Sequence, residues 1–137
     1  MWITRILLPL LLLAGCAAQK SKAPTMLTAP GNTKPAVAAQ LEQGNGLFAA
    51  RDFAGAEQVF RQTIAADPAL AEAHYNLAVT LERQGHQAEA KKHYIEAANL
   101  APGHKIIWDS PPLRTETGGY GHDIHKKSYQ DPSFKGF

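Results

Sequence analysis

The chain contains a single cysteine, Cys16, among its 137 residues. One thiol excludes an internal disulfide and every metal site that is built from several cysteines. Aromatic residues make up only 8% of the chain, and the acidic and basic residues nearly balance, with a formal net charge of +2. Such a chain has no excess of positive charge to hold a nucleic acid, and its length allows one domain with short appendages.

The motifs of the common catalytic sites are also missing. The chain has no phosphate loop, no nucleophile elbow and no dinucleotide fingerprint. The His-Glu-x-x-His zinc motif is absent, although Glu89 and His93 are four residues apart. Weak candidates for metal ligands are His122 and His125 in the C-terminal tail, since imidazole binds Zn and Cu. We predict no catalysis, no metal and no cofactor.

No apolar run reaches the roughly 20 residues that a membrane-spanning helix needs. Residues 1–15 instead carry one positive charge at Arg5, an apolar stretch and then small residues, which is the layout of a secretory signal peptide. The residues Leu13-Ala14-Gly15-Cys16 resemble the lipobox of bacterial lipoproteins. The resemblance implies cleavage before Cys16 and covalent lipid on its thiol, whose several acyl chains anchor stably. An ordinary secreted protein with a free thiol is the alternative.

The residue after the cysteine bears on localisation. In Gram-negative lipoproteins an Asp there resembles an inner-membrane retention signal, whereas this chain has Ala17. The resemblance therefore implies a lipid-anchored protein of the cell envelope, in the outer membrane and facing the periplasm. Residues 16–36 are rich in Ala, Pro, Thr and Lys and include Pro24, Pro30 and Pro35, which interrupt helices. We predict that they form a flexible tether.

Two units follow, at residues 37–70 and 71–104, related by a shift of 34 residues. Leucine, small, aromatic and proline positions recur in both: Leu47 with Leu81, Ala54 with Ala88, Ala56 with Ala90, Phe60 with Tyr94, and Pro68 with Pro102. Small residues recur where helices must approach closely, aromatic residues where side chains fill the space between helices, and a proline closes each unit. The spacing predicts helices over 37–50, 53–66, 69–84 and 87–100.

This pattern resembles the tetratricopeptide repeat. The second unit carries it at Leu77, Ala78, Leu81, Gly85, Ala90, Tyr94, Ala97 and Pro102. The first unit carries it at Gly44, Leu47, Phe53, Ala56, Phe60 and Pro68, and departs from it at Gln40, Gln43 and Thr63. The resemblance implies an all-α fold, a short α-solenoid of two helix-turn-helix repeats between a disordered N-terminal tether and a C-terminal tail.

The tail, residues 105–137, begins with three large apolar side chains, those of Ile106, Ile107 and Trp108. A solenoid usually needs three or more repeats and a capping unit at its end. We expect these three residues to fold back on the last helix pair as an end cap, or to dock on a partner or a second copy. The rest of the tail has no apolar period, which indicates disorder.

In the tetratricopeptide family the first helix of each pair lines a concave groove. The resemblance places seven residues of this chain in that groove: Leu41, Asn45, Phe48, Tyr75, Val79, Glu82 and Arg83. This mixture of apolar and amphipathic side chains suits a peptide or a helical segment. Some family members clamp a C-terminal carboxylate with one basic residue and two Asn. Here only Asn45 matches, since Leu41 and Val79 replace the other two, so we do not expect that clamp.

Together these features predict a non-catalytic, membrane-anchored adaptor or assembly factor. The resemblance to short tetratricopeptide lipoproteins implies that it binds a peptide or protein partner in a bacterial cell-envelope complex of the pilus, secretion or outer-membrane assembly type, with a homodimer left open. One alternative is a periplasmic metal-handling lipoprotein that uses the His-bearing tail. Another is an accessory subunit that docks on an envelope enzyme through Trp108 and the tail.

Overall fold

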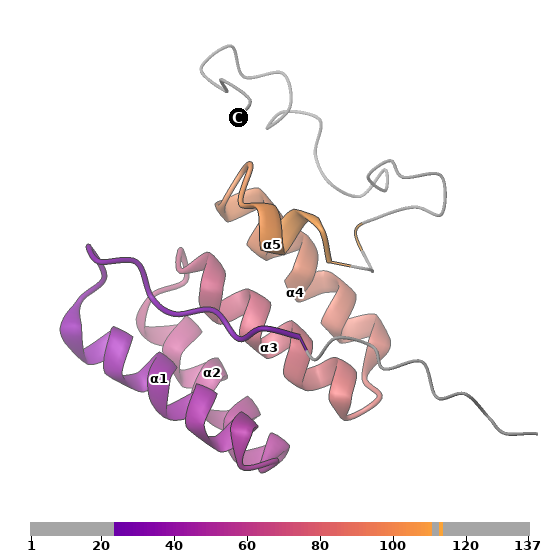
Figure 1. Cartoon of the computed structure of the whole chain (residues 1–137), viewed down its shortest axis with the longest axis horizontal. Coiled ribbons are helices and arrows are strands. Elements are labelled where there is room, and N and C mark those ends of the chain that lie inside the picture. The colour runs from indigo at the N-terminus through magenta and orange to yellow at the C-terminus, as the bar shows by residue number, and fades with distance from the viewer. Residues whose placement is uncertain (1–23, 111–112, 114–137) are drawn as a thin grey trace, which may run out of the picture.

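The computed structural model describes residues 24–110 and 113. These residues form only helices: α1 (Pro35–Ala49), α2 (Phe53–Ala66), α3 (Ala71–Arg83), α4 (Gln87–Leu100) and the short α5 (Lys105–Trp108). The helices α1 and α2 form one hairpin and α3 and α4 another, and the two hairpins pack through α2 and α3 (Figure 1). The prediction of an all-α fold with two helix-turn-helix repeats is confirmed.

The two hairpins repeat with the spacing of 34 residues that the sequence predicts. The first helices end at Ala49 and Arg83, and the second helices begin at Phe53 and Gln87. The turns also correspond, since Arg51 has a φ of 64° and Gly85 a φ of 86°. Glycine adopts this left-handed conformation freely, whereas a side chain at Arg51 crowds the backbone. The turn geometry is therefore kept even where the residue does not favour it.

Two helix starts differ from the predicted boundaries. α1 begins at Pro35, a residue that the composition assigns to the tether. Proline fits the first position of a helix, because the N–H group that it lacks would have no partner there. α3 begins at Ala71 rather than at residue 69, because the Asp67 carboxylate accepts a hydrogen bond from the Ala69 N–H at 3.1 Å and forms a turn.

A glycine lets the two helices of the first hairpin approach each other. Gly44 of α1 is buried, and it lies against the fully buried ring of Phe60 in α2. A Cβ atom added at Gly44 would lie 2.8 Å from Cζ of Phe60 and closer still to two other ring carbons. The ring thus occupies the space that any larger residue at this position would need.

We expect Gly44→Ala to lower the free energy of unfolding by about 1–3 kcal/mol, because the Phe60 ring would have to move within a packed core. Urea denaturation followed by circular dichroism measures this change. The matched control is Gly46→Ala in the same helix, where an added Cβ meets nothing within 4 Å. That control should stabilise the helix by roughly 0.5–1 kcal/mol. Equal stabilisation by both substitutions would contradict the packing described above.

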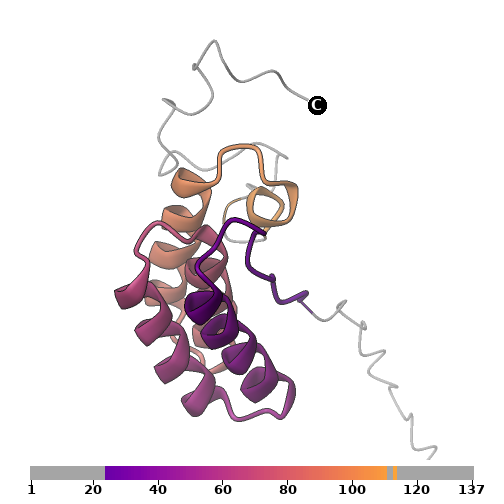
Figure 2. The same ribbon diagram turned by 90° about the vertical axis from the view of Figure 1, so that its left-hand side faces the viewer.

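Segments outside the two hairpins complete the hydrophobic core. Leu27 before α1, Ile107 and Trp108 in α5, and Leu113 after it all belong to the same buried cluster as the repeats. α5 packs against α4, and the Trp108 indole Nε1 donates a hydrogen bond to the Ala101 carbonyl at 3.1 Å. Residues 24–34 and α5 lie on the same side of the hairpins (Figure 2). They cover apolar surface that two repeats alone would leave open.

The structure therefore differs from the predicted tether and tail at the ends that adjoin the repeats. Within the tether predicted over 16–36, Leu27 is only 6% exposed. Within the tail predicted over 105–137, the first residues form α5. Two adjacent large apolar residues, Met26 and Leu27, in a segment rich in Pro and Thr give no periodic signal, so composition alone did not reveal the burial of Leu27. Cys16 and the tail histidines lie outside the described residues.

None of the helices in the described part of the chain is long and apolar enough to cross a membrane.

Candidate functional site

The segment before α1 lies on the face that α1 and α3 form together, which we call the inner face. Residues 24–29, the N-terminal segment, run as an open chain across both helices (Figure 1). In this segment Leu27 is buried, Met26 and Ala29 are half-buried, and Thr25 and Thr28 are exposed. The inner face of this protein thus carries a stretch of non-helical peptide.

Two side-chain amides hold the main chain of Leu27. The Oδ1 atom of Asn76 accepts a hydrogen bond from the Leu27 N–H at 2.8 Å, and its Nδ2 donates to the Leu27 carbonyl at 2.8 Å. Nδ2 of Asn45 donates to the same carbonyl at 3.1 Å. Asn76 Nδ2 also donates to Asn45 Oδ1 at 2.8 Å, which links the two amides. We call Asn45 and Asn76 the amide pair.

The amide pair recognises a peptide group rather than a particular side chain. Asn76 is fully buried, and burying an amide costs free energy unless its hydrogen bonds are made. Here both N–H groups of the Asn76 amide and its oxygen have partners. Since all the hydrogen bonds that the amide pair makes to Leu27 involve its backbone N–H and C=O, the inner face can hold the main chain of other sequences in the same way.

The predicted groove residues lie on α1 and α3, but they do not form an open groove. Leu41, Tyr75 and Val79 are at most 5% exposed. Asn45 and Phe48 are half-buried, and the Phe48 ring lies 5.3 Å from the ring of Phe53. The prediction of an accessible concave groove is therefore not met for these residues, and the reason is physical. These apolar side chains belong to the one buried cluster that the N-terminal segment and α5 also join.

The last two predicted groove residues, Glu82 and Arg83, have different environments. Arg83 is exposed, whereas the Glu82 carboxylate accepts a hydrogen bond from the Tyr94 hydroxyl at 2.9 Å. Burial and the charge of Glu82 raise the pKa of Tyr94 far above its usual value, so its hydroxyl keeps its proton. Glu82 is therefore engaged inside the fold, and Arg83 is the charged side chain that a partner can reach.

Tyr75 connects the inner face to the C-terminal cap. Its ring meets the ring of Tyr94 edge-on at 5.7 Å, and its hydroxyl is hydrogen-bonded to Ser110, just after α5. Burial raises the pKa of Tyr75, and its hydrogen bond with Ser110 opposes that rise. Of the predicted cap residues, Ile107 and Trp108 are buried and Ile106 is 43% exposed.

Sequence reasoning missed Asn76, although a signal for it exists. Asn76 lies three residues after Ala73 and directly before Leu77, both on the apolar stripe of that helix. A polar amide on the core side of a helix must find hydrogen-bond partners. The sequence thus marks Asn76 as a residue with a specific partner, but it does not identify that partner as Leu27.

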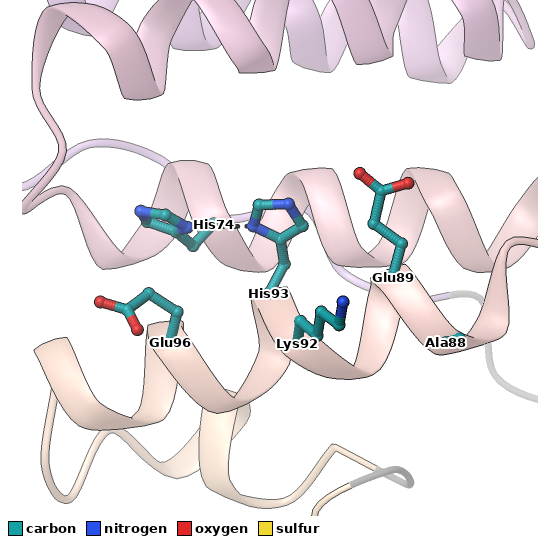
Figure 3. A pocket seen from close by; sticks show the side chains of 6 residues that line it. All are labelled: His74, Ala88, Glu89, Lys92, His93 and Glu96. Atoms are coloured by element: carbon teal, nitrogen blue, oxygen red, sulfur yellow. Dashed lines mark hydrogen bonds between the residues drawn. The ribbon is translucent and has the colours of Figure 1, made fainter.

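A histidine pair on the other side of α3 is a second polar feature that the sequence did not reveal. The Nδ1 atoms of His74 in α3 and His93 in α4 are 3.1 Å apart, and the rings face each other (Figure 3). His74 Nε2 lies 3.2 Å from the Pro68 carbonyl, which can only accept, so we assign a proton to Nε2. The His74 Nδ1 of the neutral ring then accepts a hydrogen bond from the His93 Nδ1–H.

The surroundings of this pair do not complete a metal site. An open depression beside the rings is lined by Glu89, Lys92 and Glu96 (Figure 3). Glu89 is engaged by Arg61, whose Nη2 lies 2.7 Å from its Oε1. Across residues 24–110 and 113, no group of three or more His, Cys, Asp or Glu side chains is arranged to hold a metal ion.

The histidine pair predicts a loss of stability at mildly acidic pH. Burial, followed by the charge effects of His74 and Arg61, lowers the pKa of His93 below its usual 6.5. As the pH falls below about 6.5, the unfolded chain binds a proton at this residue before the folded chain does. The free energy of unfolding should therefore decrease between pH 7 and pH 5. Urea denaturation at several pH values measures this, and His93→Gln should reduce the slope. An unchanged slope in that variant would show that other groups cause the dependence.

Residues 47–109 match the family model of the tetratricopeptide repeat, so the match extends from the last turn of α1 through α5. No curated protein and no solved structure shows a significant match to the chain. Repeats of this kind typically serve as scaffolds for interactions between proteins, which indicates a protein-interaction role for this chain.

Proposed function

From a tetratricopeptide-repeat match over residues 47–109, we propose that the chain is a non-catalytic adaptor that binds a protein partner on the inner face of α1 and α3. The observation that carries the proposal is the amide pair on the backbone of Leu27. A surface that holds main-chain N–H and C=O groups can bind a non-helical segment of another protein. Apolar side chains beneath it supply the remaining contact.

We propose further that a lipid on Cys16 anchors this adaptor in a bacterial cell envelope, at the periplasmic face of the outer membrane, where its partner belongs to an assembly or secretion complex. The support is the lipobox-like sequence Leu13-Ala14-Gly15-Cys16 after an apolar leader. Metabolic labelling with a palmitate analogue tests the anchor. Label that persists in Cys16→Ser would exclude lipid on this thiol.

The partner is best sought by crosslinking in native membranes, followed by pulldown of the full chain with a tag after Phe137. The exposed groove residue Arg83 offers a test that leaves the core intact. We expect Arg83→Glu to weaken capture, and the exposed Lys92→Glu on α4 is the matched charge reversal beside the histidine pair. Equal capture by both variants would place the interaction elsewhere than the inner face.

Truncation after His104 is not a suitable control for this experiment. It would remove Ile107 and Trp108, which are buried in the core, so a loss of capture would report unfolding. Single substitutions at exposed positions avoid that ambiguity.

A further inference from the structure

The N-terminal segment occupies the surface on which a partner would bind. Its hydrogen bonds to the amide pair come from the main chain of one residue, Leu27. The Leu27 side chain is only 6% exposed and joins the common core, while its neighbour Thr28 points to solvent. The segment is thus held as a short peptide ligand would be held, by hydrogen bonds to the backbone of one residue, by the buried Leu27 side chain and by the half-buried Met26 and Ala29.

The N-terminal segment is joined to α1 in a way that lets it leave the inner face without unfolding the helices. Between it and α1 lies a turn at residues 30–33, where the Thr33 N–H donates to the Pro30 carbonyl at 2.9 Å. The amide pair belongs to α1 and α3, and each hairpin has contacts between its own two helices, α1 with α2 and α3 with α4. Removal of the segment would therefore expose the amide pair and the apolar side chains beneath Leu27 without breaking either helical hairpin.

We propose that residues 24–29 are an internal ligand, and that the partner segment is a non-helical, uncharged peptide that displaces it. This inference rests on the proposed function, since it takes the inner face as the binding surface. The partner peptide carries an aliphatic residue in place of Leu27, because that position is buried. It is uncharged around this residue, because the amide pair is neutral and is matched to a peptide N–H and C=O rather than to a charge.

Displacement has a measurable consequence for affinity. A partner peptide must compete with a segment that is attached to the same chain and is therefore present at a high effective concentration. Binding to the intact protein is consequently weaker than binding to a variant whose segment is released. A partner must therefore bind the inner face more favourably than the internal segment does. Until it is displaced, the segment keeps the apolar inner face covered.

The test uses an acetylated and amidated peptide with the sequence of residues 24–29, Pro-Thr-Met-Leu-Thr-Ala, carrying a fluorescent label. Its binding to the full chain is measured by fluorescence anisotropy. Leu27→Asp places a charge at the buried position and releases the internal segment, whereas Thr28→Asp changes an exposed neighbour and serves as the matched control. We expect the peptide to bind the Leu27→Asp variant at least tenfold more tightly than it binds the wild type or Thr28→Asp.

A second peptide tests recognition of the backbone. N-methylation of its leucine removes the N–H that Asn76 Oδ1 accepts, and we expect at least a tenfold loss of affinity for the Leu27→Asp variant. Equal affinity of the unmodified peptide for the wild type and for Leu27→Asp would overturn the proposal. So would no binding to a Leu27→Asp variant that circular dichroism shows to be folded.

Hydrogen exchange on the wild type covers the case in which Leu27→Asp does not fold. We expect the Leu27 amide to exchange faster than the core amides of α3, because the segment opens without global unfolding. Exchange of all these amides at the same rate would make the segment a permanent part of the core and overturn the proposal. If the peptide binds in the anisotropy assay but the pulldown captures no partner, only the proposed adaptor function is contradicted.

Discussion

Replacement of Trp108 by alanine should lower the free energy of unfolding by about 3–5 kcal/mol. Trp108 is 5% exposed and lies in the core cluster with Ile107 and Leu113. Its indole N–H also donates to the Ala101 carbonyl, so the substitution removes a hydrogen bond as well as packing. Because the free energy of unfolding of a small domain is only about 5–15 kcal/mol, this loss removes a large share of the total stability.

Thermal and urea denaturation followed by circular dichroism measure the effect of Trp108→Ala. The neighbouring Ile106, which is 43% exposed, supplies the matched control, and Ile106→Ala should change the stability by less than about 0.5 kcal/mol. Trp108→Phe keeps an aromatic ring and should lose less than the alanine variant, which keeps the test useful if Trp108→Ala does not fold. An unchanged midpoint in Trp108→Ala would mean that α5 does not cap the repeats.

Asn76→Asp should destabilise the protein by about 3 kcal/mol at pH 7, although it changes the size of the side chain very little. A carboxylate cannot donate to the Leu27 carbonyl or to Asn45 Oδ1, as the Asn76 amide does. It would also be a charge at a position that is 0% exposed. The expected result is a weaker fold and a released N-terminal segment.

The pH dependence of the Asn76→Asp variant provides a check on this explanation. Burial among acceptors disfavours the ionised carboxyl, so its pKa in the folded chain rises above the unfolded value of about 3.9. Protonation then stabilises the fold, and the difference in stability from the wild type should shrink as the pH falls from 7 to 5. Asn99→Asp in α4, a half-buried position, controls for the added charge. A pH-independent difference would contradict the buried-charge explanation.

The two predictions concern the two segments that complete the core of this short solenoid. Trp108 belongs to the C-terminal cap, and Asn76 holds the N-terminal segment on the inner face. If both behave as expected, the cap is a fixed part of the fold, whereas the N-terminal segment depends on hydrogen bonds to the amide pair that a peptide can replace. That difference in attachment separates a structural element from an internal ligand.

The histidine pair has a separate role, because it joins α3 to α4 on the other side of α3. Its expected loss of stability below about pH 6.5 depends on the lowered pKa of His93 and not on the amide pair. Substitution of His93 should leave peptide binding unchanged at pH 7.5. The two polar features can therefore be tested independently.

The repeats could be predicted from the sequence because their signals are local. Small and aromatic residues recur at a spacing of 34 residues, and the helices end at equivalent positions such as Ala49 and Arg83. Periodicity within a helix depends on residues three or four apart, so it is visible without any knowledge of the fold. The presence of large apolar residues at 106–108 likewise indicates that something must bury them.

The amino-acid sequence alone thus determined the all-α class and the two helix-turn-helix units, with the groove residues on the first helix of each unit. Only the tertiary structure decided that Leu27 covers the inner face, since 49 residues separate it from Asn76. The same holds for the facing rings of His74 and His93, 19 residues apart. A buried polar group requires a partner, but the chain segment that supplies it is set by how the helices pack, which no local pattern records.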